Sequence, residues 1–578
     1  MKQARLINQV VGGSYEQDER IAGCAVSQNL YAESVEAASN GFYYTTALRS
    51  VPGERVVLED FIDNDTYHQN CRGAFVASDE SIFAAFGDGV YRITKGAFGA
   101  LFAEKIYTEA VPKVSSVRFC ETGGVNSHVC WVNGTTNVFA YPLAPEKATA
   151  SGFTVPLKFF TPLRQYKTAD QVINDTEERV SPDQICCVNG SLIINDPETD
   201  TWYFTDPYIL GGVTYTREIY DLDDEGNVQY KDGSAYEVKT KEVRLTESDP
   251  GNGTSYLWLD RYSKPKFTTA SYSADRLTGI VTSGEFLFSF GTASIQVYGQ
   301  SLSTDAQGFS SIEFTSTGRN FDEIGCRNAR TIVGMNNGVV FLGSSSRGER
   351  SVWYTNGGEP FRLSTNAIER MLDGKELSDA YALGYFDNGH AFYCLTVPEL
   401  DRTFVYDFAT KQWHNRSTFR MDSTEGKWWA EFAVCTYGRI YIAGGAVDKL
   451  VMLDRTKFDD YKGEPIVKRR TAPILTSDYS PFMVNELMLL WNTGTTTDAT
   501  NESGARNPVV MLEVSRDGGN TYDDERWAYG GETGHYGHRT IWYGIGCGTM
   551  FVFRFTITDR VNVVITGAKV SHTALMHF

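Results

Sequence analysis

Apolar and polar residues alternate along the middle of the chain in short stretches that are separated by glycine-containing turns. Five such stretches begin at Ile185, Thr278, Thr331, Tyr381 and Phe432, and two weaker ones begin at Gly73 and His128. Alternation with a period of two, bounded by Gly with Asn or Asp, is typical of β-strands joined by tight turns. Each stretch therefore predicts a hairpin followed by an aromatic-rich third strand.

Asn-Gly pairs mark four of the turns, at Asn133, Asn189, Asn337 and Asn388. They predict hairpins, because both central residues of a type I′ turn need positive φ. The stretches recur at intervals of roughly 50 residues, which is the length of a four-stranded propeller blade. We predict an all-β protein with a β-propeller of about six to eight blades. A β-sandwich or a solenoid with similar hairpins is the alternative.

Two side chains in the Tyr381 stretch fit the outer part of a blade. Asp407 ends an apolar strand, where a carboxylate accepts hydrogen bonds from turn amides. Trp413 follows and is expected to pack between blades. Helical periodicity is scarce, and the best candidate is a short helix after Ser364 or Thr365 that decorates a blade.

Composition and a change of rhythm define the domains. The 34 Phe, 32 Tyr, 10 Trp and 54 Gly suit short strands and turns. Residues 207–265 are polar and acidic, which predicts an inserted hairpin that projects from a blade. Longer strands after Pro473 indicate a β-sandwich-like domain. We divide the chain into an extended segment (1–55) that packs on this accessory domain, the propeller (56–472) and the sandwich (473–578).

The formal charge of −19 and the pI of about 5.0 disfavour a basic groove that wraps nucleic acid. An acidic wall would instead repel a duplex and let it slide, although a negative surface also simply keeps a protein soluble. We find no apolar core of a secretion signal and no apolar run of ~18 residues. The ten cysteines include the adjacent Cys186 and Cys187 but no C-x-x-C pair, so we expect reduced thiols and no zinc.

Few residues suggest chemistry. The stretch Ser515–Tyr522 (SRDGGNTY) matches the Asp-box turn of sialidases, in which Asp517 accepts turn amides. His535 and His538 could bind a metal, but a glycine-rich turn explains them better, since no nearby Cys or carboxylate completes a tetrahedral set. Acid pairs such as Asp459-Asp460 and Asp523-Asp524 are expected to be acidic turns, and Lys468-Arg469-Arg470 is expected to be solvated. We predict no catalytic residue, no cofactor and no metal site.

Several segments resemble, in their order, the packaged-DNA stabilisation protein family of short-tailed phages, also called the tail hub or nozzle. The similar segments are NLYAESVE from Asn29, ALRSVPG from Ala47, TWYFTD from Thr201, FSFGTASIQVY from Phe288, VSRDGGNTY from Val514 and VNVVITGAKV from Val561. The insertion between Thr205 and Lys264 departs from the family pattern.

This resemblance implies a structural virion protein, not an enzyme, that assembles in the host cytoplasm into a homo-hexameric ring below the portal. Such a ring closes the portal channel, retains packaged DNA, docks tail fibres or tailspikes and conducts DNA during ejection. The implied partners are the portal adaptor, which segment 1–55 is positioned to meet, a tail needle or plug, and non-specifically passing double-stranded DNA. The alternatives are a carbohydrate-binding or carbohydrate-cleaving propeller of the sialidase or tailspike kind, and a kelch-like module of a cellular regulator.

Overall fold

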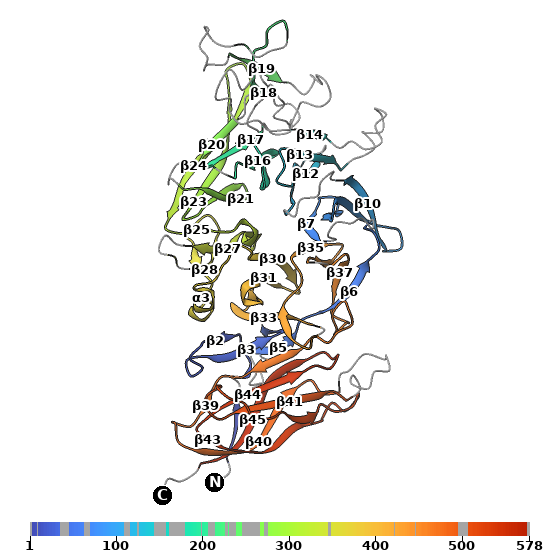
Figure 1. The fold of residues 1–578 in the computed structure, drawn as a ribbon, viewed down its shortest axis with the longest axis vertical. Coiled ribbons are helices and arrows are strands. Elements are labelled where there is room, and N and C mark those ends of the chain that lie inside the picture. The colour runs from blue at the N-terminus through green and yellow to red at the C-terminus, as the bar shows by residue number, and fades with distance from the viewer. Residues whose placement is uncertain are drawn as a thin grey trace.

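The computed structural model describes the main chain of most of the protein. The described residues are 3–7, 10–34, 46–62, 70–108, 116–123, 127–143, 158–160, 180–197, 199–205, 214–225, 229, 239–245, 266–270, 275–344, 348, 350–420, 422–445, 447–494 and 507–574. Figure 1 shows three tiers along the long axis, with a sandwich at one end beside both termini, a propeller in the middle, and the β18–β19 hairpin at the other end.

Seven blades form the propeller within the described residues, in agreement with the predicted six to eight. Blade 1 contains β7 (Cys71–Val76), β8 (Ile82–Phe86), β9 (Gly89–Lys95) and β10 (Leu101–Thr108). Blade 2 contains β11 (Arg118–Glu121), β12 (His128–Val132), β13 (Val138–Pro142) and β14 (Lys158–Phe160). Blade 3 contains β15 (Ile185–Val188), β16 (Ser191–Asn195), β17 (Thr201–Phe204) and β20 (Lys266–Thr269).

Blades 4 to 7 follow in chain order, and the N-terminal strand β6 completes the last one. Blade 4 contains β21 (Leu277–Ser283), β22 (Phe286–Gly291), β23 (Ser294–Thr304) and β24 (Phe309–Asp322), and blade 5 contains β25 (Gly325–Cys326), β26 (Val333–Met335), β27 (Gly338–Ser344), β28 (Arg350–Thr355) and β29 (Phe361–Arg362). Blade 6 contains β30 (Tyr381–Asp387), β31 (His390–Val397), β32 (Arg402–Asp407) and β33 (Gln412–Phe419). Blade 7 contains β35 (Phe432–Thr436), β36 (Arg439–Ala443), β37 (Leu450–Asp454) and β6 (Gly53–Leu58).

Each blade buries both faces of its sheet. In β8, Ile82, Ala84 and Phe86 pack against blade 7, whereas Phe83 and Ala85 pack against blade 2. Because successive side chains of a strand point to opposite faces, such a strand is apolar throughout. Seven clusters of this kind fill the seven gaps between blades, and an eighth fills the sandwich. The ring of blades is therefore closed by packing as well as by β6.

Local predictions are mostly confirmed. Asn189-Gly190 and Asn388-Gly389 have positive φ at both residues, as a type I′ turn requires. Two turns differ from the prediction: the turn before β27 uses Asn336 and Asn337, and in the loop after β12 Gly134 has positive φ, not Asn133. The predicted helix is α3 (Asn366–Leu372), capped by the Thr365 side chain, which accepts from the Ile368 amide.

The inserted region lies between β17 and β20, which pair directly in blade 3. Its strands β18 (Thr214–Tyr220) and β19 (Thr240–Leu245) form an antiparallel pair, and β18 runs parallel to the start of β24. The insertion therefore extends the sheet of blade 4 away from the propeller (Figure 1). Residues 246–265 lie outside the described residues.

The sandwich combines strands from both ends of the chain. One sheet contains β1 (Gln3–Ile7), β4 (Leu30–Ser34), β5 (Thr46–Ser50), β40 (Phe482–Trp491), β43 (Thr540–Gly548) and β45 (Val564–Ala574). The other contains β3 (Cys24–Gln28), β38 (Lys468–Thr471), β41 (Val509–Ser515), β42 (Arg526–Tyr529) and β44 (Met550–Ile557), with the two-residue strands β2 (Tyr15–Glu16) and β39 (Leu475–Thr476) alongside. This second sheet continues into blade 6, because β3 pairs with both β38 and β33. The short strand β34 (Glu425–Lys427) pairs with β33.

Candidate functional site: the propeller–sandwich junction and the propeller axis

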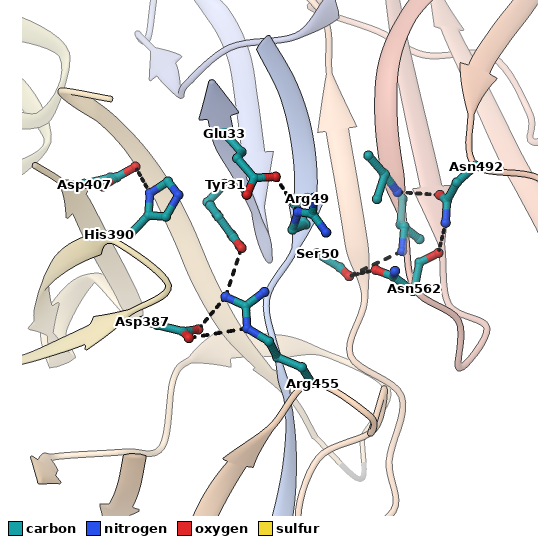
Figure 2. A network of polar contacts seen from close by, with 12 residues as sticks. Tyr31, Glu33, Arg49, Ser50, Asp387, His390, Asp407, Arg455, Asn492 and Asn562 are labelled. Carbon is teal, nitrogen blue, oxygen red and sulfur yellow. Dashed lines mark hydrogen bonds and ion pairs between the residues drawn. The ribbon is translucent and has the colours of Figure 1, made fainter. Parts of the chain in front are cut away.

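Arg455 links three separate elements at the junction of the two domains (Figure 2). It follows β37, and its guanidinium donates to both oxygens of Asp387 at 2.8 and 3.3 Å. A further bond of 3.3 Å reaches the hydroxyl of Tyr31 on β4. Blade 6, the N-terminal segment and the chain leaving blade 7 are thus held together by one side chain.

A buried histidine–carboxylate pair lies next to this network. His390 Nδ1 is 2.8 Å from Asp407 Oδ2, and the Asp407 carboxylate also accepts from the Ala409 amide and the Thr410 hydroxyl. The bond to Asp407 raises the pKa of His390, although burial acts in the opposite direction. The turn-binding role predicted for Asp407 is confirmed, and Trp413 is buried at the contact between blades 5 and 6.

Polar side chains on the sandwich side fix the N-terminal strands. Arg49 Nε donates to Glu33 Oε2 at 2.5 Å between β5 and β4 (Figure 2). Ser50 accepts from the Val563 amide, and the Asn492 side chain bonds the backbone at Asn562 and Val564. These contacts hold β5 against β4 and against the segment at Val563. They thereby set the position of β6, which begins a few residues later.

Two of the three residues in the basic run at 468–470 are buried, so the prediction of a solvated run is wrong for them, whereas Arg469 is partly exposed. Lys468 and Arg470 are each 1% exposed on β38, in the sheet shared by the two domains. Arg470 donates to the carbonyls of Val10 and Gly13, and Lys468 donates to the carbonyl of Asp559. Burial lowers the pKa of Lys468 to about 7. These cations bind backbone of the N-terminal segment and the sandwich, because the chain crosses here between two packed bodies.

A buried carboxylate marks the strand that closes the propeller. Glu54 on β6 is 5% exposed and accepts from the indole nitrogens of Trp428 and Trp429 at 2.9 and 2.8 Å. Arg416 lies 3.9 Å away and stacks over the Trp428 ring. Nearby Asp460 is also buried, and burial raises its pKa to about 6. Asp460 accepts from the amides of Lys462 and Glu464, so it lies in an acidic turn as predicted, and this turn is buried at the junction.

The propeller axis is bridged by side chains. The inner strands β7, β11, β15, β21, β26, β30 and β35 contact one another in a closed ring. In blade 5 a 3₁₀ turn (Ala329–Thr331) interrupts the inner strand between β25 and β26. Arg118 of blade 2 donates across to the Ala329 carbonyl at 3.0 Å, and Arg330 pairs with Glu431 before blade 7 at 2.8 Å.

The remaining sequence candidates have structural roles. Asp517 accepts from the amides of Asn520 and Thr521 and from the hydroxyls of Ser515 and Thr521, as predicted for an Asp box. Burial acts to raise its pKa, but these bonds prevail and lower it to about 2. Asp523 pairs with Arg516 at 2.7 Å. His538 contacts the Tyr529 carbonyl, and the exposed His535 lies in the adjacent turn.

Within the described residues we find no group of three His, Cys, Asp or Glu side chains arranged to hold a metal ion, and all ten cysteines are free thiols. The same part of the chain contains no helix long and apolar enough to cross a membrane. The absence of catalytic, cofactor and metal sites remains a prediction.

A seven-bladed propeller fused to a sandwich, with polar residues in turns and at a domain junction, defines a β-propeller protein with an accessory β-sandwich domain. Two family models match the chain in order: "Bacteriophage P22 Gp10, beta-propeller" over residues 232–457 and "Bacteriophage P22 Gp10, beta-sandwich" over residues 469–573. Together they cover more than half of the chain, which belongs to the bacteriophage P22 Gp10 family. The predicted family and fold class are confirmed.

Solved structures similar to this chain are remote. A catalytically inactive virginiamycin B lyase from Staphylococcus aureus, with quinupristin, is 11% identical, with a TM-score of 0.34 over 69% of this chain and 98% of that one. A Trypanosoma rangeli sialidase mutant with trans-sialidase activity is 8% identical, with a TM-score of 0.28 over 95% of this chain and 97% of that one. No curated protein sequence matches the chain.

Proposed function

We propose that the protein is one subunit of a homo-hexameric ring in a phage tail, which closes the portal channel, retains packaged DNA and conducts it during ejection. The single observation that carries this proposal is the ordered match of both domains to the phage family. The ring would assemble in the host cytoplasm and become part of the virion. Its partners would be the portal adaptor, tail fibres or tailspikes, and a needle or plug.

The bridged propeller axis supports a channel between subunits. Arg118 and Ala329 join opposite blades across the axis, so a duplex has no path through a single propeller. A conduit then has to lie where several copies meet around a common axis. The net charge of −19 per copy favours sliding of the duplex over adhesion, because like charges repel.

Rigidity of the subunit also supports the proposal. Blade 6 and the sandwich share a sheet, and the N-terminal segment contributes strands to both domains. A subunit built in this way transmits force between its two ends without a flexible linker. We propose that it performs no enzymatic step. We also propose that its domains divide near 55/56 and 472/473, with β6 (Gly53–Leu58) crossing the first division into blade 7 and β38 (Lys468–Thr471) preceding the second as part of the sandwich sheet.

The assembly is testable with recombinant protein. We expect light scattering after size-exclusion chromatography to give the mass of six copies, alone or with the portal adaptor, and negative-stain images to show rings with an axial hole. A matched variant, Arg539→Glu on the exposed surface of the sandwich, controls for non-specific association. A protein that stays monomeric with the adaptor, and that is absent from purified virions, contradicts the proposal.

A further inference from the structure

We propose that the axial end of the propeller at which the inner strands begin is a binding site for a small oxyanion of the phosphate class, formed by Arg118 and Arg330. Arg118 is the first residue of β11, and Arg330 is in the 3₁₀ turn that interrupts the inner strand of blade 5 just before β26. We call this pair and its surroundings the axial site.

Arg118 is a partly buried cation that has no ion pair with a carboxylate among the described residues. Its only hydrogen bond among the described residues is the one to the neutral Ala329 carbonyl at 3.0 Å, and its Nε is buried with no partner. The carboxylate of Asp183 acts on Arg118 electrostatically, but it accepts a hydrogen bond from the Asn195 side-chain amide at 2.7 Å. A buried charge is costly unless it is paired, so this guanidinium favours a counter-ion.

Arg330 adds a second positive charge at the same place. Burial and the neighbouring Arg330 lower the pKa of Arg118 to about 10. In the part of the chain that the structure describes, one carboxylate is bonded to this pair, that of Glu431, which contacts Arg330 at 2.8 Å. The Arg330 side chain is 36% exposed and stacks over Tyr381, so solvent reaches the axial site. Two guanidinium groups therefore share one bonded carboxylate in an accessible place.

The geometry favours a small tetrahedral anion. Planar guanidinium groups bind phosphate oxygens in a bidentate manner, and two of them from different blades supply donors from two directions. Because Arg118 already joins opposite blades, the site has no room for a threaded nucleic-acid strand. We therefore assign free phosphate, and not the phosphodiester backbone, as the ligand.

The test compares melting temperatures of the purified full chain in potassium phosphate and in potassium chloride at equal ionic strength. We expect phosphate to raise the melting temperature of the wild type by a few degrees, and titration calorimetry to give one site per chain. Arg118→Gln should lose both effects. Glu431→Gln should bind phosphate several-fold more tightly, since it removes the carboxylate that competes for Arg330. Arg319→Gln, at an exposed arginine of blade 4, should behave like the wild type.

Specific outcomes would overturn the assignment. An equal phosphate response in wild type and Arg118→Gln places the effect elsewhere. If Arg118→Gln fails to fold, the affinity of Glu431→Gln for phosphate decides instead. An affinity equal to or weaker than that of the wild type would also place the phosphate effect outside the axial site. A hexathymidylate that binds in an Arg118-dependent manner, where inorganic phosphate does not, assigns the site to nucleic acid instead.

Discussion

Several charged side chains in this protein are bound by specific partners, and the partners are mostly backbone or turn groups. Arg470 binds two carbonyls of the N-terminal segment, Asp517 accepts from its own turn, and His390 shares a short bond with Asp407. A charge that loses such a partner inside a protein is costly. Single substitutions at these positions therefore report on well-defined interactions.

The His390–Asp407 pair predicts a pH-dependent stability difference. The pKa of His390 is raised in the folded state. Its contribution to the free energy of unfolding is therefore fully present below the pKa of the unfolded chain, about 6.5, and is lost as pH rises through the pKa of the folded state. Glu33, Arg455 and Tyr31 also face it, as does His414, whose pKa burial lowers to about 3. We expect His390→Gln to lower the free energy of unfolding, measured with urea, by about 1–2 kcal/mol at pH 5.5 and by much less at pH 9. His535→Gln, at an exposed histidine, should show no such dependence.

The Asp-box turn gives a second prediction. Asp517→Ala removes the acceptor of two amides and two hydroxyls and should lower the free energy of unfolding by about 1–3 kcal/mol. Guanidinium chloride denaturation measures the loss, and Asp524→Ala, at the exposed neighbour, should change it little. Equal losses in the two variants would contradict the structural role of this turn.

The strand that matters most among the elements is β6, because it lets the N-terminal segment close the ring of blades. It pairs with β37 from Gly53 to Leu58 and completes blade 7. Because β6 is the outermost strand of blade 7, its pairing binds the N-terminal part of the chain to the last blade, so the ring cannot open there without breaking this pairing. Glu54 ties this strand to Trp428 and Trp429 in the loop before β35.

Substitution of Glu54 tests this closure. In Glu54→Gln the amide has one acceptor oxygen for two indole donors, and Arg416 loses its nearest carboxylate. We expect a loss of about 3 kcal/mol in unfolding free energy and a shift in tryptophan emission of the folded protein. Glu59→Gln, at the exposed end of the same segment, should leave both unchanged. Identical behaviour of the two variants would show that closure does not depend on this carboxylate.

At the scale of the whole molecule, the two domains form one mechanical unit. A single sheet runs from β30 of blade 6 through β3 into β42 of the sandwich, and the first 58 residues contribute strands to the sandwich and β6 to blade 7. Domains that share a sheet and a buried junction are expected to unfold together, whereas domains joined by an exposed linker unfold separately.

Calorimetry tests this coupling. We expect the wild type to unfold in one transition. The double variant Arg455→Met with Asp387→Asn removes the link to Tyr31 without leaving an unpaired charge, and its transition should divide into two. Arg539→Met, at an exposed site of the sandwich, should keep one transition. Two transitions in the wild type, or one in the double variant, would contradict the model of a single unit.

The sequence by itself determined the blades, several turns, helix α3, the Asp box and the family. These features depend on neighbours close along the chain: the alternation in β8, the Asn388-Gly389 turn and the Thr365 cap all arise within a few residues. Physical preferences of this kind are readable from local patterns. The sequence limited the number of blades to about six to eight but did not determine it, because the last blade takes the strand β6 from the other end of the chain.

Only the tertiary structure decided what the charged residues do. Nothing near Lys468 or Arg470 in the sequence indicates that both are buried, since their partners are Asp559 and residues 10–13. The same holds for Arg118, which meets Ala329 from more than two hundred residues away. A charge is buried or solvated according to which distant segments pack around it, and that arrangement exists only once the ring of blades has closed.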